Sequence, residues 1–347
     1  MHVIKVKNAH QALPEGLSLL DRVGVKRDSR NGPVVVAPGP VTTQFQRPNE
    51  RVLFWEDRDA NPFFHLYEAL WMLAGRNDVE GVARYVARMR EFSDDGSTLH
   101  GAYGHRWRKW FGTDQLQRIA IELQDNPDSR RCVLGIWDVA SDLGQRGKDL
   151  PCNTQVYLSR DDEGRLDMTV CNRSNDVIWG AYGANVVHFS VMQEFMAAAI
   201  GCDVGQYWQM SNNYHAYEET LEPLKHLADQ ARDPFRSPAP DPYDFEDIKP
   251  YPLVSTAIGS WLQDLHMLLD TDGAVIGLRD PFLRRVATPL LMAHRAWKEK
   301  EGVERFEAAF DILKQAAECD WCRAAEEWLG RRYHKWQRAV DDGPGYE

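Results

Sequence analysis

The middle of the chain changes from the two-residue period of a strand to the longer period of a helix and back again. Residues 157–160 and 166–172 flank the turn Asp161-Asp162-Glu163-Gly164, and apolar residues alternate along the second run, which predicts a β-hairpin. Residues 185–200 are the most apolar helical segment and end at Gly201. Residues 206–210 then predict another strand. This part of the chain must therefore pack strands and helices together.

Weaker patterns precede this segment. Residues 15–20 predict a short helix, although Gly16 counts against it, and residues 34–36 and 52–55 predict short strands. Apolar side chains at helical spacing predict a helix over 63–73 that Gly75 ends, and a second helix over 79–92. Glu68 lies within the first of these helices. It is either on a solvated face or buried for a purpose.

A proline-rich, polar stretch from Pro238 to Pro252 marks a change of character. Only helical patterns follow it, including the stripe Trp261, Leu262, Leu265, Leu268 and Leu269. We therefore expect two parts, a catalytic domain over residues 1–250 and an all-helical extension over 251–347. The extension shows no catalytic cluster, and its expected roles are those of a lid or a subunit contact.

The net charge of −11 argues against a protein that coats nucleic acid, because such proteins need a basic surface to displace counterions. Any phosphate that the protein binds must then meet a local cluster of arginines. The first residues lack the apolar run of a signal peptide, and no window is long and apolar enough for a membrane span. Six cysteines in 347 residues do not form a disulfide framework, which indicates a cytoplasmic protein. Cys319 and Cys322 are spaced one helical turn apart. Without a second pair or histidines at ligand spacing, this is weak evidence for a metal site, so no metal is expected.

Two segments place reactive and polar groups close together in sequence. Cys152 follows Pro151 at the entrance to a predicted strand, and residues 172–176 read Asn-Arg-Ser-Asn-Asp at the end of another. A thiol beside a group of anion-binding and hydrogen-bonding side chains suggests covalent chemistry on a polar, anionic small molecule. Taken alone, the cysteine would be read as a small buried hydrophobic residue.

Further polar groups recur at predicted strand ends and in loops. Guanidinium groups bind phosphate oxygens in pairs, so several arginines outside helix interiors fit a phosphate site, and a carboxylate, an amide and a tyrosine would suit a nucleoside. The residues are Arg30, Arg130, Arg131, Arg173, Ser174, Asp176, Asn185, His215 and Tyr217.

The order of these motifs and their residues resemble those of the thymidylate synthase family over residues 15–250. The similar segments are Glu68-Ala69-Leu70-Trp71, residues 99–107 (Leu-His-Gly-Ala-Tyr-Gly-His-Arg-Trp), residues 126–131 (Asn-Pro-Asp-Ser-Arg-Arg), Trp137, Leu150-Pro151-Cys152, residues 172–176, residues 180–185 and His215-Ala216-Tyr217. The resemblance implies an α+β fold with a twisted mixed β-sheet, surrounding helices and a homodimeric assembly.

The resemblance also implies the nucleotide site. Cys152 would be the thiolate that adds to carbon-6 of a pyrimidine nucleotide and so makes carbon-5 nucleophilic. The 5′-phosphate would be held by Arg30, Arg173 and Ser174, and across the dimer interface by Arg130 and Arg131. Arginines near the thiol would favour the thiolate.

The remaining roles follow in the same way. His215 and Tyr217 match the pair that binds the sugar hydroxyl, and Asp176 matches the carboxylate near the base and the folate ring. Glu68 and Tyr103 match the groups that organise water and handle the carbon-5 proton. The one-carbon donor would be 5,10-methylenetetrahydrofolate.

Departures from the synthase pattern favour a hydroxymethylase branch, in which water adds to the exocyclic methylene instead of a hydride. Met89 and Phe92 stand where synthases have tryptophans, and Asn153 stands where they have the histidine after the catalytic cysteine. Residues 341–347 show no counterpart of the apolar tail that closes over the cofactor. In a phage, such an enzyme would work in the host cytoplasm and supply a modified nucleotide for DNA.

The base is the least determined feature. Residues 180–185 carry one residue more than the usual spacing. If the extra residue is looped out, Asn185 is the amide that reads uracil, and dUMP is the substrate. If it is not, Ala184 takes that place and dCMP stays open. The expected product is therefore 5-hydroxymethyl-dUMP; the alternatives are dCMP hydroxymethylation, thymidylate synthesis from dUMP, and a non-catalytic nucleotide-binding relic of the fold.

Overall fold

The computed structural model describes residues 1–232, 241–246 and 248–341, so part of the predicted boundary segment and the last six residues lie outside the described ranges. The described residues form two sheets, one six-stranded with the order β1-β4-β9-β7-β6-β5 and one four-stranded with the order β2-β3-β10-β8. The strands are β1 (His2–Val6), β2 (Val25–Arg27), β3 (Val34–Val36), β4 (Val41–Phe45), β5 (Val133–Gly135), β6 (Asn153–Arg160), β7 (Leu166–Asn172), β8 (Asn175–Asp176), β9 (Val204–Ser211) and β10 (Tyr214–Tyr217).

The predicted hairpin is the centre of the larger sheet. β6 and β7 pair antiparallel, and the buried apolar side chains of β7 are the alternating Leu166, Met168 and Val170. β7 also pairs with β9, and this pairing is parallel. A parallel pair needs a crossover connection, which the apolar helix supplies, so the mixed sheet follows from the strand–helix–strand order of the sequence.

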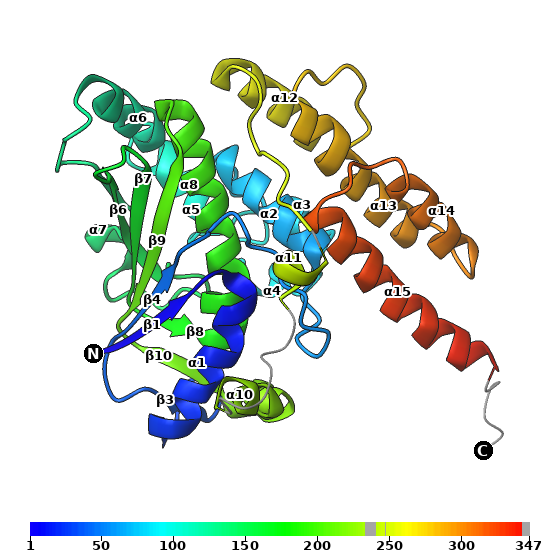
Figure 1. Ribbon diagram of the computed structural model, residues 1–347, viewed down its shortest axis with the longest axis horizontal. Helices are drawn as coiled ribbons and strands as arrows, with labels where there is room; N and C mark the ends of the chain where they lie inside the picture. The colour runs from blue at the N-terminus through cyan, green and yellow to red at the C-terminus, as the bar shows by residue number, and fades with distance from the viewer. Residues whose placement is uncertain (233–240, 247, 342–347) are drawn as a thin grey trace.

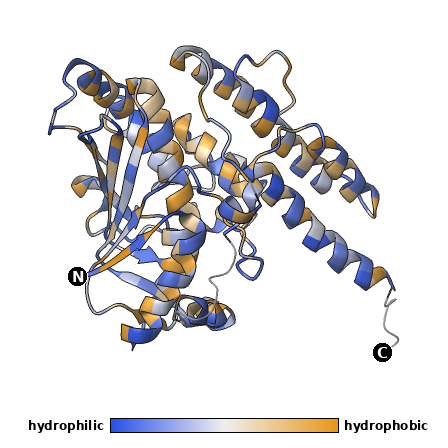
Figure 2. Ribbon diagram, in the orientation of Figure 1, coloured by the Kyte–Doolittle hydropathy of each residue, from blue (hydrophilic) through white to orange (hydrophobic). Residues whose placement is uncertain are grey.

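Helices cover the sheet in successive layers. α8 (Val186–Ile200) contacts β7 and β9 on one side and α2 (Pro62–Leu73) on the other, and α2 contacts the C-terminal helices α13 and α15 (Figure 1). In Figure 2 α8 and α2 are largely hydrophobic, as their position between other layers requires. The other helices before residue 250 are α1 (Ala9–Val23), α3 (Val79–Ala83), α4 (Met89–Phe92), α5 (Tyr103–His105), η1 (Arg106–Trp110), α6 (Gln115–Asp125), α7 (Val139–Asp142), η2 (Val177–Asn185), α9 (Glu218–Leu221), η3 (Glu222–Leu224), α10 (Lys225–Arg232) and α11 (Pro242–Phe245).

Two local predictions were wrong and one predicted helix was too short, each because of tertiary contacts. The helix predicted over 15–20 is the longer α1, in which Gly16 lets the helix approach two buried tyrosines; a Cβ there would lie 2.2 Å from the ring of Tyr182. Residues 52–55 are not a strand, since the Val52 N–H donates to the hydroxyl of Tyr243 at 3.1 Å. The helix predicted over 79–92 is split into α3 and α4, and between them Tyr85 stacks against Tyr67 and His294.

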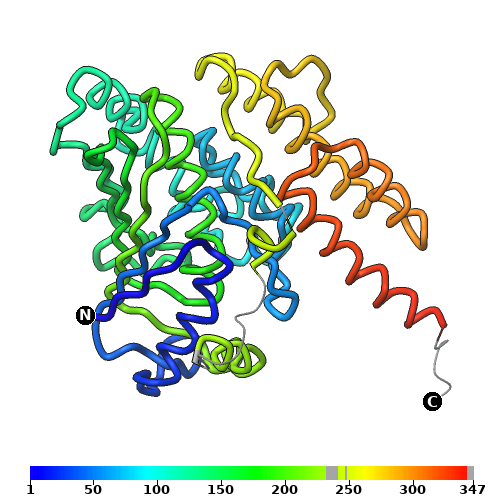
Figure 3. Tube along the Cα trace, in the orientation of Figure 1, coloured from blue at the N-terminus to red at the C-terminus, as the bar shows by residue number. Residues whose placement is uncertain are grey.

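The C-terminal part is helical, as predicted. Residues 248–257 run along the body to α12 (Figure 3), and the Leu253 N–H donates to the carboxylate of Glu194 in α8 at 2.9 Å. Among the described residues of the chain, no helix has the length and apolar character that crossing a membrane requires. The helices are α12 (Ile258–Asp270), η4 (Leu283–Ala287), α13 (Thr288–Glu299), α14 (Glu304–Leu313) and α15 (Asp320–Asp341).

The extension is joined to the body by a buried polar contact as well as by apolar packing. Asp320, at the start of α15, is buried and accepts a hydrogen bond from the hydroxyl of Tyr243 at 3.0 Å. Burial raises the pKa of Asp320 to about 7, and the positive charge of Arg51 offsets only part of this shift. Buried apolar residues run without a break from the body into the extension. The division at residue 250 therefore remains a prediction.

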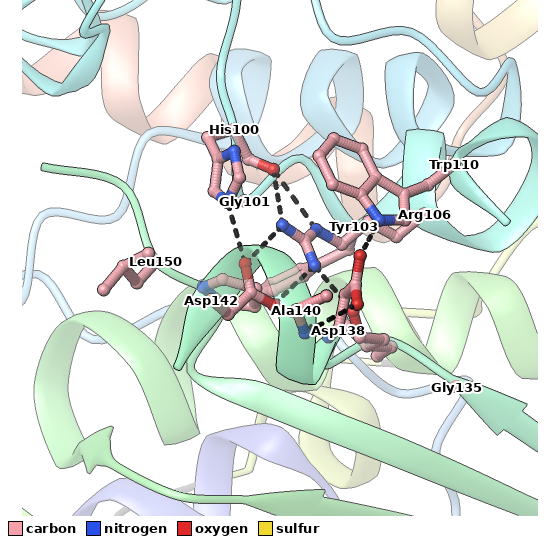
Figure 4. A network of polar contacts seen from close by, with 12 residues as sticks. His100, Gly101, Tyr103, Arg106, Trp110, Gly135, Asp138, Ala140, Asp142 and Leu150 are labelled. Carbon is pink, nitrogen blue, oxygen red and sulfur yellow. Dashed lines mark hydrogen bonds and ion pairs between the residues drawn. The ribbon is translucent and has the colours of Figure 1, made fainter. Parts of the chain in front are cut away.

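A buried ion pair holds the segment after residue 99 against the sheet (Figure 4). The guanidinium of Arg106 donates to both carboxylate oxygens of Asp142, at 2.7 and 2.8 Å, and to the carbonyl oxygens of His100 and Ile136. Both charged side chains are fully buried. Burial by itself would raise the pKa of Asp142, but hydrogen bonds from Arg106, the Asp138 N–H and His100 outweigh it and lower that pKa.

We expect Asp142→Asn to destabilise the fold by about 3–5 kcal/mol, because it leaves the Arg106 guanidinium buried without its counter-charge. Urea unfolding measures the difference. Glu80→Gln is the matched control, because its ion pair with Arg90 is exposed and should change stability by no more than about 1 kcal/mol. Equal effects of the two substitutions would contradict the larger contribution to stability expected of the buried ion pair.

The raised pKa of Asp320 makes a pH prediction. In the unfolded chain the carboxyl has the ordinary pKa of 3.8, so between pH 4 and 7 the folded state alone holds its proton, and this group's contribution to stability falls as pH rises. Asp320→Asn removes this loss of stability, because an amide does not titrate. Relative to the unchanged protein, the variant should gain stability from pH 5 to pH 7 by about 1.4 kcal/mol per pH unit, as measured by urea unfolding. Asp311→Asn, at an exposed position of the extension, should show no such trend.

Candidate active site

Cys152 lies between Pro151 and the first residue of β6, and two side chains lie close to it. The Cys152 N–H donates to the hydroxyl of Tyr103 at 3.3 Å. The Arg173 guanidinium donates to the carbonyl oxygen of Pro151 at 2.8 Å, and its Nη2 lies 3.9 Å from the Cys152 sulfur. The thiol is partly exposed, so a substrate could reach it.

The electrostatic setting of the thiol differs from the expectation. Burial raises the pKa of Cys152, and the nearby Arg173 lowers it by less. Asp149 raises it further. The arginine effect expected to favour the thiolate is therefore outweighed in the single chain. Burial, followed by the neighbouring Cys152 and Asp149, raises the pKa of the Tyr103 hydroxyl as well, so this hydroxyl keeps its proton.

The sugar- and phosphate-binding candidates lie on neighbouring strands. β10 pairs with β8 so that His215 is opposite Asp176, and the rings of His215 and Tyr217 meet edge to face at 5.5 Å. The turn that carries Arg30 reaches this strand, because the Asn31 amide donates to the hydroxyl of Tyr217 at 3.4 Å. Ser174 follows Arg173 in the loop between β7 and β8.

Arg130 and Arg131 are not brought to Cys152 within the chain. They lie exposed in the turn between α6 and β5, where Arg131 pairs with Glu122 at 3.2 Å. Of the expected phosphate arginines, only Arg173 is in contact with the residues around the thiol.

Asp176 has one occupied and one free carboxylate oxygen. Its Oδ1 accepts hydrogen bonds from the N–H groups of Ile178 and Trp179, at 3.0 and 2.5 Å, at the start of η2. Its Oδ2 is buried and has no hydrogen-bond partner among the described residues. Burial raises the pKa of this carboxyl. Beside it Trp179 is 56% exposed and lies under the guanidinium of Arg58 at 4.3 Å.

Asn185 ends η2, a π-helical segment with non-helical backbone at Tyr182 and Gly183. The backbone is kinked at these two residues, and the kink is where the additional residue of 180–185 is accommodated. The Asn185 side chain is buried, donates to Asn175 Oδ1 at 2.9 Å and accepts from Asn153 Nδ2 at 3.1 Å. Asn185, rather than Ala184, therefore lies in the polar cluster behind Cys152.

Glu68 is buried in α2, so it does not lie on a solvated face of that helix. Its Oε2 lies 3.1 Å from Nε2 of His188, although the contact lacks hydrogen-bond geometry. Its charge also contributes to the raised pKa of Asp149, after the larger effect of burial. Asp149 accepts the N–H of Gly101 at 2.8 Å, which ties the loop before Tyr103 to the segment before Cys152. In the described ranges, no three His, Cys, Asp or Glu side chains group in a way that could hold a metal ion.

Asn175 and Gln209 complete the polar cluster behind Cys152. Neither was predicted as a site residue, although Asn175 belongs to the motif over 172–176. The Asn175 amide donates to Gln209 Oε1 at 2.7 Å and to Ser211 Oγ at 2.9 Å, and all three residues are buried. A signal was present, since the two-residue period of β9 puts Gln209 and Ser211 on the same face as the buried Tyr207. Two polar residues on a buried strand face indicate a hydrogen-bonded network.

The comparisons with known proteins agree with one another. The family model described as thymidylate synthase matches residues 24–246. A deoxyuridylate hydroxymethyltransferase of Pseudomonas phage M6 is 55% identical over 352 residues that span the whole of both chains. Proteins of the same name from Bacillus phage SP01 and Delftia phage PhiW-14 are 38% identical over 51% of this chain and 27% identical over 81% of it, covering 49% and 81% of their own lengths.

The family model covers most of the chain, including every residue proposed for the site, and one relative aligns along its whole length. The chain therefore belongs to the thymidylate synthase family, and within it to the pyrimidine nucleotide hydroxymethylase branch.

Proposed function

We propose that this protein transfers a hydroxymethyl group to carbon-5 of dUMP and forms 5-hydroxymethyl-dUMP. The observation that carries the proposal is the 55% identity, over the whole of both chains, to a phage protein named deoxyuridylate hydroxymethyltransferase. The position of Asn185 in the cluster behind Cys152 supports uracil as the base, because an amide can both donate and accept hydrogen bonds.

Cys152 is the proposed nucleophile. Its sulfur adds to carbon-6 of the pyrimidine, and the electron pair moves toward the oxygen at carbon-4, which makes carbon-5 nucleophilic. Because burial raises the pKa of this thiol, the protein must supply positive charge near it. Arg173 does so at 3.9 Å. Glu68 and Tyr103 are the proposed groups for ordering water and moving the carbon-5 proton.

The phosphate site supports a homodimer. Arg30, Arg173 and Ser174 are proposed to bind the 5′-phosphate from within the chain, and His215 with Tyr217 the sugar hydroxyl. Arg130 and Arg131 lie exposed and away from the thiol, so we propose that they serve the site of a second copy. Guanidinium groups from two chains would let an acidic protein hold a dianion.

The proposed one-carbon donor is 5,10-methylenetetrahydrofolate, which supplies a methylene group when it is bound. The residues around Asp176 fit such a cofactor. The unpaired, buried Asp176 Oδ2 is an acceptor for the N–H groups of a pterin ring, and the exposed face of Trp179 offers a surface for an aromatic ring.

Hydroxymethylation, rather than methylation, requires water at the exocyclic methylene. Met89 and Phe92, which stand where synthases carry tryptophans, are on α4, a helix with no buried residue. Their exposure supports the proposal that α4 covers the site loosely enough to admit water. Thymidylate synthesis is the second candidate, favoured by membership of the family alone. The phage origin of the relatives supports the host cytoplasm as the place of action.

The product decides between these functions. In parallel incubations with 5,10-methylenetetrahydrofolate, mass spectrometry should detect 5-hydroxymethyl-dUMP, which is one oxygen heavier than dTMP, from dUMP, and no hydroxymethylated product from dCMP. Cys152→Ala, which removes the nucleophile, should abolish turnover. Formation of dTMP with dihydrofolate would overturn the proposal, and so would full turnover by Cys152→Ala.

The shared phosphate site makes a separate prediction. Arg130→Ala should weaken dUMP binding by roughly ten- to a hundredfold, because a charge-assisted hydrogen bond contributes about 1.5–3 kcal/mol. Calorimetric titration measures the affinity, and unfolding experiments should show unchanged stability, since Arg130 is exposed. Arg295→Ala, at an exposed arginine of the C-terminal extension, is the control. Unaltered affinity of the Arg130 variant would refute the shared site.

A further inference from the structure

Five buried amide side chains form a directed series behind Cys152, which we call the amide chain. Each donates its N–H to the carbonyl oxygen of the preceding one. Gln209 accepts from Asn175 at 2.7 Å, Asn175 from Asn185 at 2.9 Å, and Asn185 from Asn153 at 3.1 Å. Asn153 in turn accepts from Asn172. Every hydrogen bond in the series therefore points the same way.

A backbone carbonyl sets this direction. Nε2 of Gln209 donates to the carbonyl oxygen of Ala181 at 3.3 Å, and a carbonyl cannot donate in return. The other partners at this end are the hydroxyls of Tyr207 and Ser211, which can donate or accept. At the far end, Oδ1 of Asn172 has no partner among the described residues. In the described part of the protein, Ala181 is thus the contact that orients the whole amide chain.

The fold is built to admit this arrangement. All five side chains are buried, so water cannot replace a lost partner. Gly180 leaves the space that the central link needs, since a Cβ at that position would lie 2.7 Å from Asn175 Oδ1 and 3.4 Å from Asn185 Nδ2. The non-helical backbone at Tyr182 and Gly183 interrupts η2 directly after Ala181, where its carbonyl accepts from Gln209.

The direction matters at Asn185. One of its N–H bonds and one lone pair of its oxygen are used within the amide chain, which leaves one donor and one acceptor for a base. Uracil offers N–H at position 3 and an acceptor at position 4, whereas cytosine offers the reverse. An amide held in one orientation can match only one of these patterns, and a reversed amide would match the other.

We propose that Gln209 and Asn175 are positioning residues that set the base specificity by fixing the orientation of the Asn185 amide. This inference rests on the proposed function, in which Asn185 reads the base. Neither residue needs to touch the nucleotide. Cutting the series between Ala181 and Asn185 would let the amides reverse together, and the enzyme would lose its preference between uracil and cytosine.

Two substitutions at one position separate orientation from stability. Gln209→Met keeps the size of the side chain but removes both the donor and the acceptor, so the amide chain loses its anchor. Gln209→Glu cannot donate to Ala181, yet a carboxylate only accepts, so it still takes the N–H of Asn175 and keeps the direction. Burying a carboxylate beside a carbonyl oxygen should make this second variant the less stable of the two.

The matched control is Gln193, another buried glutamine whose amide donates to two backbone carbonyl oxygens, those of Leu166 and Gln206 at 2.8 and 3.0 Å. It lies outside the amide chain. Gln193→Met should lower stability and leave base preference unchanged. Asn175→Ala breaks the series one link nearer Asn185, and it serves if Gln209→Met does not fold.

The measurement is calorimetric affinity for dUMP and for dCMP, together with product formation from each. The dUMP-to-dCMP affinity ratio should fall by about tenfold or more in Gln209→Met and Asn175→Ala, and stay within about threefold in Gln209→Glu and Gln193→Met. An unchanged ratio in the first pair, or an equal loss in Gln209→Glu, would overturn the inference.

The same titrations separate this inference from the proposed function. If the unchanged protein prefers dCMP and Gln209→Met loses that preference, the base assignment is wrong but the orienting role stands. If the unchanged protein binds and converts neither nucleotide, the proposed function fails and the inference fails with it.

Discussion

Buried polar side chains at the ends of β6, β7 and β9 impose the strongest constraint on this structure. Asn153 and Asn172 are opposite each other in the hairpin. On the adjacent strand Ser211 is opposite Asn172, and Gln209 is opposite Val170. Because water is excluded, each amide must find its partners among its neighbours, and a missing partner would cost about 1–3 kcal/mol. The strand register therefore has to place these groups within hydrogen-bonding distance, and the same register puts Cys152 and Arg173 side by side.

The rest of the body holds this end of the sheet in place. The Arg106–Asp142 ion pair fixes the segment that carries Tyr103, and the contact of Gly101 with Asp149 joins it to the segment before Cys152. Behind the sheet, α8 and α2 provide an apolar support that continues into the C-terminal helices. The extension thus stabilises the layer that contains Glu68, and up to residue 341, where its described part ends, it supplies no residue of the candidate site.

The electrostatics of the site suggest a protein that is incomplete as a single chain. Burial raises the pKa values of Cys152, Asp149 and Asp176, so the charged forms of these groups are less stable here than in water. A dianionic nucleotide adds further negative charge. Additional guanidinium groups from a second copy would compensate for it, which is why the position of Arg130 and Arg131 away from the thiol is informative.

Much of this protein could be read from its sequence, because hydrophobic periods and short motifs are local. The hairpin, the apolar helix over 185–200, the helical C-terminal part and the family were predicted correctly, and Cys152, Arg173 and Tyr103 are brought together in the structure. Local patterns failed where distant residues decide the outcome, as at Gly16, which packs against tyrosines far along the chain, and at residues 52–55, whose backbone bonds to Tyr243. The burial of Glu68, the kink before Asn185 and the direction of the amide chain were likewise decided only by tertiary structure. Each depends on hydrogen bonds or packing between residues that become neighbours only after the sheet has formed.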